Sequence, residues 1–343
     1  MEIVAVNILI TGGAGYIGSH VLKQLLETTT HTIVVIDNLS TGQQQTIDIL
    51  QNIRLFEFLK LDLGDFESVK TLFENYDIEV VLHFAASIVV PESVSNPLKY
   101  YMNNTVNTTY LIDIAVKANV NKFVFSSTAA VYGEPTEIPL EGVSEIFPTN
   151  PINPYGMSKL MSEQILCDVA KAYPSFRYII FRYFNVAGAD SVSTIPLIGQ
   201  SLPDATHLIK VATECAIGKR EKILIFGDDY ETYDGTGVRD YIHVDDLARA
   251  HIDAIDYLKH HESDIFNIGY GVGYSVKKII RTIEKISGKQ LSVEVVPRRE
   301  GDPAQLIADN RKIIQKMKWN PQYADLECIC KSVLKWEEKS INA

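Results

Sequence analysis

The sequence predicts an α/β fold with a doubly wound parallel sheet, and two observations lead to it. In the first half of the chain, short apolar runs alternate with segments of helical periodicity. The apolar runs are hydrophobic almost throughout, which is typical of parallel strands that are buried on both faces. Parallel strands need crossover connections, and the intervening helical patterns supply them. With 343 residues and 46% hydrophobic content, the chain is long enough to bury a substantial core.

The expected elements follow one another closely along the chain. Helical patterns begin at about Gly15 and recur through residues 68–73, near 97–118 and over 154–172. Beyond residue 188 the sequence becomes richer in loops, and its strands and helices are shorter. Ligands of a doubly wound fold bind beyond the carboxyl ends of the strands, so we expect this later part to form a smaller α/β substrate-binding part. The expected strands are residues 6–11, 32–37, 54–62, 79–86 and 122–127, followed by the apolar stretch 177–188.

A glycine-rich turn in residues 10–26 (ITGGAGYIGSHVLKQLL) joins the first strand to the first helix. The glycines fit G-x-G-x-x-G from Gly13, or G-x-x-G-x-x-G through Gly12, Gly15 and Gly18. Between a strand and a helix, such glycines let the backbone approach a pyrophosphate, and the helix directs its positive N-terminal end at it. Both patterns predict a Rossmann-type dinucleotide-binding fold.

Two aspartates follow the second and third strands. Asp37 lies 19 residues after Gly18, where a carboxylate can bind both hydroxyls of the adenosine ribose and repel a 2′-phosphate. No arginine follows it before Arg54, so NAD is expected rather than NADP. Asp62 is placed to reach the adenine, although a surface aspartate is nearly as good an interpretation. We expect a NAD-binding domain over residues 1–185, to which some later elements return, and a substrate-binding domain over 186–343.

Tyr155 and Lys159 stand four residues apart at the start of an expected helix, so they share one helix face. An unperturbed tyrosine has a pKa of about 10, and positive charge beside the phenol favours the phenolate. Tyr155 follows Thr128 by 27 residues, and the strand that ends there offers hydroxyl groups at Ser126, Ser127 and Thr128. The pattern predicts that Tyr155 acts as a base near neutral pH.

With these residues the chain resembles the extended short-chain dehydrogenase/reductases, whose fingerprint is G-x-x-G-x-x-G with a later Y-x-x-x-K. The resemblance favours Gly12, Gly15 and Gly18 as the working triplet and treats Gly13 as an additional small residue of the turn. Within that group the chain is most similar to the UDP-glucose 4-epimerases of the NAD-dependent epimerase/dehydratase family. The likeness covers nearly the whole chain in blocks that occur in the right order, namely TGGAGYIGSH, DNLSTG, HFAA, ESVSNPLKYYMNN, FSSTAAVYGEP, NPYGMSKLMSEQIL, RYFNVAGA, IFGDDYETYDGTGVRDYIHVDDLARAH and PRREGDPA.

The resemblance implies an inversion at carbon 4 that interconverts UDP-glucose and UDP-galactose, with tightly held NAD. Tyr155 would remove the proton of the 4-hydroxyl while hydride passes to NAD, and Thr128 would share the hydrogen bond to that hydroxyl. Lys159 would hold the nicotinamide ribose and lower the pKa of Tyr155. The 4-keto sugar would then turn over in the pocket and take the hydride back on its other face.

The resemblance also implies two sets of binding residues. Arginines suit a diphosphate because they form bidentate, charge-assisted hydrogen bonds. NAD would be bound by Gly12, Gly15, Tyr16, Ile17, Gly18, Asp37, Asn38, Asp62, Leu63, Phe84, Ala85, Ala86 and Asn103, with Tyr155 and Lys159. The UDP-sugar would be bound by Asn185 and Leu208 (diphosphate), Leu224 and Phe226 (uracil), Arg239 and Arg299 (phosphates) and Asp302 (uridine ribose), with Thr128, Tyr155, His207 and Leu306.

Three positions depart from the family's pattern. Ile88 stands where a lysine often lies near the nicotinamide and the sugar phosphate, and His207 stands where an asparagine often faces the sugar. Leu306 occupies the pocket-wall position at which a tyrosine restricts the site to plain hexoses and a small residue admits N-acetyl sugars. A UDP-N-acetylhexosamine or UDP-pentose 4-epimerase therefore stays open as an alternative.

Two other classes share the fold. Nucleotide-sugar 4,6-dehydratases carry an Asp-Glu pair directly after the threonine, whereas Ala129 and Ala130 follow Thr128 here, so the proton carriers for elimination are missing. A non-enzymatic NAD-binding regulator is the second class. The joint presence of Thr128, Tyr155 and Lys159 favours an enzyme, because a regulator does not need a base.

Composition bears on partners and location. The net charge of −11 and the absence of a basic stretch argue against a nucleic-acid partner. No apolar run reaches about 18 residues and no leader pattern precedes the first strand, so we expect a cytoplasmic protein without a membrane contact. The four cysteines, Cys167, Cys215, Cys328 and Cys330, are expected to be reduced, with no metal site. The resemblance implies a homodimer through the helices near 97–118 and 154–172.

Overall fold

The computed structural model describes residues 5–135, 138–139, 141–190, 198–202, 206–299 and 302–339. The chain forms two compact units, each built from separated stretches. Unit 1 comprises Met1–Gly133, Pro148–Arg182 and Ala248–Phe266, and unit 2 comprises Glu134–Phe147, Tyr183–Leu247 and Asn267–Ala343. No helix within the described ranges is long and apolar enough to cross a membrane.

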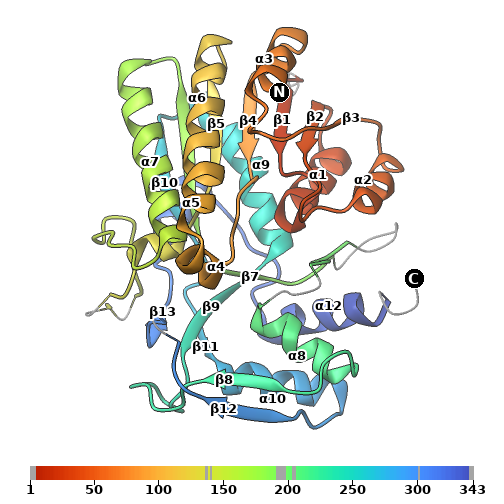
Figure 1. Ribbon diagram of the computed structural model, residues 1–343, viewed down its shortest axis with the longest axis vertical. Coiled ribbons are helices and arrows are strands. Elements are labelled where there is room, and N and C mark those ends of the chain that lie inside the picture. The colour runs from red at the N-terminus through yellow and green to blue at the C-terminus, as the bar shows by residue number, and fades with distance from the viewer. Residues whose placement is uncertain are drawn as a thin grey trace. The chain divides into compact units, whose positions relative to one another are not determined.

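A seven-stranded sheet is the centre of unit 1 (Figure 1). Its order is β10 (Asp264–Ile268), β6 (Arg177–Tyr183), β5 (Lys122–Thr128), β4 (Val80–His83), β1 (Asn7–Thr11), β2 (Thr32–Asp37) and β3 (Glu57–Lys60). β1 pairs in parallel with β2 and with β4, so that Leu9 lies opposite Val34 on one side and Val81 on the other. The doubly wound α/β fold predicted from the sequence is confirmed.

The third and fourth strands are shorter than the apolar runs that predict them. β3 begins at Glu57 rather than at residue 54, because the Arg54 guanidinium binds the carbonyl oxygens of Thr29 and His31 and Leu55 points into solvent. β4 ends at His83, and the following residues 84–89 form a loop. The expectation of strands over the full ranges 54–62 and 79–86 was therefore wrong at these ends.

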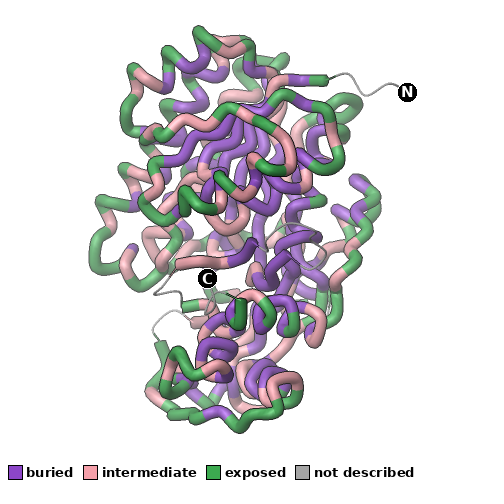
Figure 2. Tube along the Cα trace, turned by 90° about the vertical axis from the view of Figure 1, so that its right-hand side faces the viewer, coloured by how far each residue is buried: buried purple, intermediate pink, exposed green. Residues whose placement is uncertain are grey.

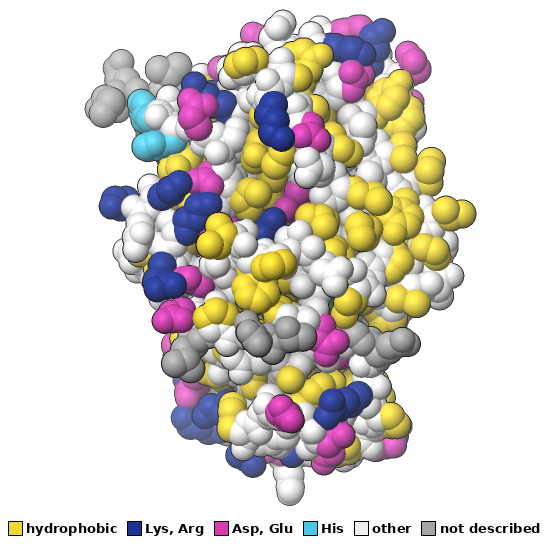
Figure 3. All heavy atoms as spheres, turned by 90° about the vertical axis from the view of Figure 1, so that its left-hand side faces the viewer, with side chains coloured by type: hydrophobic (Ala, Val, Ile, Leu, Met, Phe, Trp, Pro, Cys, Tyr) yellow, Lys and Arg dark blue, Asp and Glu magenta, His cyan; other side chains and the backbone are white. Residues whose placement is uncertain are grey.

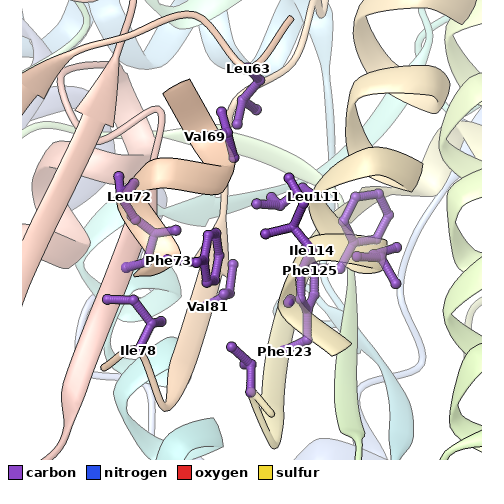
Figure 4. Packing of buried hydrophobic residues seen from close by; sticks show 14 of the residues in the cluster. Leu63, Val69, Leu72, Phe73, Ile78, Val81, Leu111, Ile114, Phe123 and Phe125 are labelled. Atoms are coloured by element: carbon purple, nitrogen blue, oxygen red, sulfur yellow. The ribbon is translucent and has the colours of Figure 1, made fainter. Parts of the chain in front are cut away.

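Both faces of the sheet are buried, as the continuous apolar runs predict. On one face, Leu9, Val81 and Phe123 pack in a cluster with side chains of α3 (Phe66–Asn75), α6 (Asn107–Lys117) and α7 (Pro154–Ala172), part of which Figure 4 shows. The alternate strand residues Ile8, Ile10 and Leu82 are also fully buried. The strands consequently form the long buried segments in Figure 2. The remaining helices of the first 60 residues are α1 (Tyr16–Thr28) and α2 (Gln44–Gln51).

The helical stretch expected near 97–118 is not a uniform α-helix. It begins with α5 (Pro97–Tyr100), continues as a π-helix, η1 (Tyr101–Val106), and only then becomes α6. A π-helix is uncommon and is found often at functional sites. Hydrophobic periodicity does not distinguish it from an α-helix, so the sequence gave no signal for this widening.

Unit 2 holds two smaller sheets. In the first, β9 (Val238–His243) pairs with β7 (Asn185–Ala187), β11 (Gly273–Ser275) and β13 (Gln305–Leu306). In the second, β8 (Ile223–Phe226) pairs in parallel with β12 (Val293–Val296). The principal helices are α8 (Leu208–Ala216), α10 (Val276–Ser287) and α12 (Leu326–Lys339), while α9 (Val244–His260) begins in unit 2 and continues into unit 1.

Candidate active site

The topological switch point of the sheet lies between β1 and β4, because the chain reaches the β3 edge and then returns past β1. Ligands of open α/β sheets bind at this point, outside the carboxyl ends of the strands. The glycine turn after β1 and the loop after β4 meet there. A Cβ on Gly12, whose φ is +73°, would stand 2.7 Å from the Ala85 amide nitrogen, so only glycine allows this approach.

The other glycines of the turn have different duties. A Cβ on Gly18 would collide with the Gly12 carbonyl oxygen, and a Cβ on Gly13 would lie 2.5 Å from the Val35 side chain. A Cβ on Gly15 would meet only the Gly12 carbonyl oxygen, at 3.3 Å. Gly13 is therefore required for packing on β2, which corrects its interpretation as an additional small residue. Gly15 is the glycine at which the turn stays open, beside the N-terminus of α1, and this cradle fits a pyrophosphate.

Asp37 stands at the end of β2 against the glycine turn. Its Oδ2 accepts a hydrogen bond from the Ala14 amide at 3.0 Å, and its Oδ1 accepts one from the Leu39 amide at 2.8 Å. Burial raises the pKa of this carboxyl, and the backbone donors oppose the rise. Two anchored oxygens beside the turn suit the two hydroxyls of a ribose.

The other predicted adenosine contacts surround the end of β3. Asn38 donates from Nδ2 to Asp62 Oδ2 at 2.6 Å, and the Gly64 amide donates to Asp62 Oδ1 at 2.7 Å. Leu63 is buried in the core cluster of unit 1. Tyr16 and Ile17 open α1 directly after the glycine turn. The structure thus brings the predicted set together at one edge of the sheet.

The loop after β4 is fixed by side chains from two directions. Phe84 packs on the His251 ring, with 4.9 Å between the ring centroids. Asn103 donates from Nδ2 to Ser87 Oγ at 3.2 Å, which places this predicted cofactor residue beside the loop. Ile88 is nearly half exposed.

Thr128 and Tyr155 are in direct contact. Thr128 ends β5 and caps the following 3₁₀ turn (Ala129–Tyr132), because its Oγ1 accepts a hydrogen bond from the Ala130 amide at 3.1 Å. With that lone pair engaged, the hydroxyl proton is directed at the Tyr155 phenol, and this hydrogen bond lowers the pKa of Tyr155. Burial is the larger influence and raises that pKa. Tyr155 sits in the first turn of α7, which Asn153 caps by accepting a hydrogen bond from the Gly156 amide at 2.9 Å.

Lys159 is held one helical turn later, at the carboxyl end of β5. Its Nζ donates to the Ser126 carbonyl oxygen at 2.7 Å and lies 4.8 Å from the centroid of the Phe125 ring. Burial lowers the pKa of this amine to about 7, and Glu163 opposes the shift. Lys159 is not among the influences on the pKa of Tyr155. In the ligand-free protein the lysine therefore does not depress the phenol's pKa, in contrast to the expectation from the sequence.

Four residues near these groups were missed by sequence reasoning. Glu163 accepts hydrogen bonds from Arg182 Nη2 at 2.7 Å and from the Ser127 hydroxyl, and Arg182 Nη1 donates to the Tyr132 hydroxyl at 3.0 Å. All four are buried, so the network ties β5, β6 and α7 together beside Lys159. Glu163 follows Lys159 by one turn, and this i,i+4 spacing was the available signal.

His83 at the end of β4 completes the floor of the site. Its Nδ1 lies 2.6 Å from the Thr11 hydroxyl and its Nε2 lies 2.8 Å from the Thr108 hydroxyl. Burial, assisted by the charge of Lys159, lowers the pKa of His83 to about 3. The ring is neutral at pH 7 and joins the carboxyl ends of β1 and β4.

The predicted substrate residues lie in unit 2, where they form three groups. Arg239 of β9 lies 3.6 Å from the Asp302 carboxylate and stands in register with Leu306 of β13. The Arg299 guanidinium stacks 3.5 Å from the centroid of the Phe226 ring. The remaining residues are Asn185 at the start of β7, Leu224 on β8, and His207 and Leu208 at the N-terminus of α8.

His207 is anchored through the segment that precedes α8. Its Nδ1 lies 2.8 Å from Gln200 Nε2, and burial lowers the pKa of the imidazole. The Gln200 carbonyl oxygen accepts hydrogen bonds from Lys210 Nζ at 3.0 Å and from Trp336 Nε1 at 3.2 Å. The C-terminal helix α12 thus supports the position of His207.

The chain is similar to known proteins over nearly its full length. The profile of the NAD dependent epimerase/dehydratase family matches residues 8–269. The chain belongs to this family.

Named relatives agree with the family match. A UDP-glucose 4-epimerase of Azospirillum brasilense is 46% identical over 332 residues, which is 96% of this chain and 92% of that protein. The solved UDP-Glc/GlcNAc 4-epimerase of Campylobacter jejuni is 56% identical, with a TM-score of 0.85 over 98% of this chain and 100% of that one. The UDP-glucose 4-epimerase of Bifidobacterium longum, solved in complex with NAD+ and UDP, is 36% identical with a TM-score of 0.92, over 98% of this chain and 99% of that one.

The cradle of unit 1 fits the cofactor of the family. The turn is open at Gly15 and closed at Gly12, Gly13 and Gly18, and the Asp37 carboxylate stands beside it. A backbone approach for the pyrophosphate and an acceptor for the ribose are the two features that NAD needs. In the described part of the chain, no group of three His, Cys, Asp or Glu side chains could hold a metal ion.

Proposed function

We propose that the protein interconverts UDP-glucose and UDP-galactose by NAD-dependent inversion at carbon 4. The observation that carries this proposal is the contact between Thr128 and Tyr155 at the carboxyl end of β5, with Lys159 one helical turn away. It places a phenol, a hydroxyl and an amine beside the switch point of a dinucleotide-binding sheet. The named relatives and the family match support the same reaction.

The roles of the three residues follow from their chemistry. Tyr155 Oη takes the proton of the 4-hydroxyl and later returns it, so it acts first as base and then as acid. Thr128 holds that oxygen by its hydrogen bond and orients the phenol. Lys159, with one proton engaged by the Ser126 carbonyl oxygen, has others to offer to the nicotinamide ribose. When bound, NAD supplies reversible hydride transfer at carbon 4.

The charge needed to form the phenolate depends on the cofactor in this proposal. Burial raises the pKa of Tyr155 in the ligand-free protein. The positive nicotinamide ring of oxidised NAD favours the phenolate when it lies nearby. Tyr155 therefore becomes an effective base only after NAD has bound.

The family includes dehydratases, and the residues after Thr128 argue against that reaction. Ala129 and Ala130 form the 3₁₀ turn that Thr128 caps. Neither residue carries an acid or a base, which elimination of water requires. Inversion needs only the proton carrier that Tyr155 supplies.

UDP would be bound by residues of unit 2. Arg239 and Arg299 provide guanidinium groups for the phosphates, Asp302 a carboxylate for the ribose, and Phe226 an aromatic face for the uracil. The Arg239–Asp302 ion pair is long, at 3.6 Å, which leaves donors of the arginine for a ligand. Asn185, His207, Leu208, Leu224 and Leu306 complete the proposed set.

A second candidate substrate is a UDP-N-acetylhexosamine. Leu306 is buried on β13, and leucine is smaller than the tyrosine that restricts the site to plain hexoses. The Campylobacter jejuni relative is named a UDP-Glc/GlcNAc 4-epimerase and shares 56% of its residues with this chain. This candidate differs from the first in the sugar and shares its chemistry.

Incubation with single substrates tests both candidates. The purified protein is mixed with UDP-galactose, UDP-N-acetylgalactosamine or UDP-arabinose, without added NAD, and the sugars are analysed by chromatography. We expect conversion of UDP-galactose to UDP-glucose, and the second arm decides the N-acetyl candidate. If no sugar is inverted at carbon 4, the proposed function is wrong.

We also propose a homodimer in the cytoplasm, with no nucleic-acid partner. Exposed apolar side chains recur at every fourth residue along α4 (Val90–Ser95), α5, η1 and α6, and Met161 of α7 adds to them. Figure 3 views the side on which these helices lie and shows hydrophobic side chains gathered there. Leu98 and Met102 are 73% and 58% exposed, which is unusual for adjacent apolar residues on a monomer surface. The row is Val94, Leu98, Met102, Val106 and Tyr110.

A pair of charges tests the dimer. Leu98→Glu with Met102→Glu would place carboxylates in a self-complementary interface, so we expect a monomer in analytical ultracentrifugation. Leu55→Glu, at an exposed site outside the row, is the matched control. A wild-type protein that sediments as a monomer would contradict the dimer.

The four cysteines and the net charge support the remaining parts of this proposal. Cys167, Cys215, Cys328 and Cys330 carry free thiols, as expected for a reducing compartment. The net charge of −11 opposes binding to a phosphate backbone.

A further inference from the structure

Asn104 is a buried amide in the π-helix η1, only 1% exposed, and the proposed reaction does not use it. Its Oδ1 accepts hydrogen bonds from the Ser87 amide at 2.8 Å and from Asn103 Nδ2 at 3.2 Å. Its Nδ2 donates to the Ser87 carbonyl oxygen at 2.9 Å and to Ser158 Oγ at 3.1 Å. The side chain therefore binds both backbone groups of Ser87, as a neighbouring β-strand would.

The two ends of this connection carry the proposed chemistry. Ser87 directly follows the loop residues Phe84, Ala85 and Ala86, which are proposed to bind NAD. Ser158 lies next to Lys159 in α7, and its hydroxyl donates to the Tyr155 carbonyl oxygen at 2.8 Å. Asn104 thus joins the cofactor loop to the first turn of the catalytic helix.

The π-helix brings Asn104 into this position and is itself tied to α7. Thr105 Oγ1 donates to the Ser158 carbonyl oxygen at 3.1 Å. Ser162 Oγ lies 3.1 Å from the same carbonyl oxygen and 3.4 Å from that of Asn104. These additional contacts hold η1 on α7 without touching the loop, so the loop contact is specific to the Asn104 side chain.

We propose that Asn104 is a positioning residue that sets the distance between the NAD-binding loop and the Tyr155–Lys159 turn. This inference rests on the proposed function. Hydride transfer is sensitive to displacements of about 1 Å, so a loop that drifts from α7 slows the reaction even when substrate still binds. Only a side chain with both a donor and an acceptor satisfies Ser87, and an amide of this length does so.

The test is the isosteric change Asn104→Asp, with Ser162→Ala as the matched control. Aspartate keeps the acceptor for the Ser87 amide but cannot donate to the Ser87 carbonyl oxygen or to Ser158. The control removes a contact of the same π-helix with α7 and leaves the loop contact in place. Ser158→Ala is a milder second variant that breaks only the far end of the connection.

Three readouts are measured on the full-length protein with its bound NAD: hydrogen exchange of residues 84–90, retention of NAD during gel filtration, and kcat and KM for UDP-galactose. We expect Asn104→Asp to exchange residues 84–90 at least tenfold faster, to retain less NAD, and to lose about tenfold or more in kcat with KM within about threefold. Ser162→Ala should stay within about twofold of wild type in all of them.

The proposal is overturned if Asn104→Asp keeps wild-type exchange in residues 84–90, or if Ser162→Ala loses as much kcat as Asn104→Asp. Should Asn104→Asp fail to fold, Ser158→Ala decides: unchanged kcat and NAD retention would reject the connection. If the wild type converts no UDP-sugar, the proposed function fails, while exchange and NAD retention still test the role of Asn104.

Discussion

The buried ion pair of Arg182 and Glu163 gives the sharpest prediction on stability. The guanidinium meets the carboxylate through Nε at 3.2 Å and Nη2 at 2.7 Å, and both side chains are at most 5% exposed. Arg182→Met preserves much of the apolar volume but leaves Glu163 as an uncompensated charge in the interior. Breaking such a pair from one side costs about 3–5 kcal/mol in the free energy of unfolding. Loss of the hydrogen bond to the Tyr132 hydroxyl adds about 1 kcal/mol.

Urea denaturation at a fixed NAD concentration measures this loss, because a ligand that binds the folded state shifts the apparent stability. Lys117→Met is the matched control, since the Lys117–Asp113 pair is 72% and 51% exposed and such pairs contribute about 0–1 kcal/mol. The double change Arg182→Met with Glu163→Gln removes both charges and should recover part of the loss. A loss of less than about 1 kcal/mol in Arg182→Met would refute the reasoning, because the pair would then behave like an exposed one.

The remaining predictions concern the cofactor turn and the catalytic pair. Gly15→Ala should fold normally but lose NAD on gel filtration, whereas Gly13→Ala should be less stable to urea because its Cβ would meet Val35 at 2.5 Å; equal NAD loss with unchanged stability in both would contradict this division of roles. Tyr155→Phe should keep bound NAD and lose about 10²–10⁴-fold in kcat, and a wild-type rate would remove Tyr155 from the acid–base role. Burial lowers the pKa of Lys159 to about 7 in the folded protein, so between about pH 7 and 10.4 the unfolded chain binds more protons and wild-type stability rises with pH. Lys159→Met should lose that rise in urea titrations at pH 7 and pH 9.5, and an unchanged slope would show that the amine is not desolvated.

Much of the fold was legible in the sequence because its signals are local. The runs at residues 6–11 and 32–37 contain β1 and β2 because a strand buried on both faces must be apolar at every position. The helix expected at 154–172 has those bounds, since Asn153 and Pro154 form a standard helix start. The strand ends at 54–56 and 84–86 were misjudged because Arg54 and the Ser87 contact act across long stretches of chain.

The candidate site divides along the same line. The glycine motif, Asp37, and the Tyr155–Lys159 spacing are short patterns, and the structure gathers them near one switch point. Glu163 and Arg182 were missed because each looks like an ordinary charged residue until burial pairs them.

The sequence by itself determined the fold class, the family and the residue types available for chemistry, because periodicity, spacing and motifs are properties of neighbouring residues. Tertiary structure alone decided how those residues act. It made Gly13 a packing residue and Gly15 the open one, it raised the pKa of Tyr155 through burial, and it brought Asn104 to Ser87 across 17 positions of the chain. Desolvation and long-range hydrogen bonds depend on what surrounds a group in space, and no linear pattern records that.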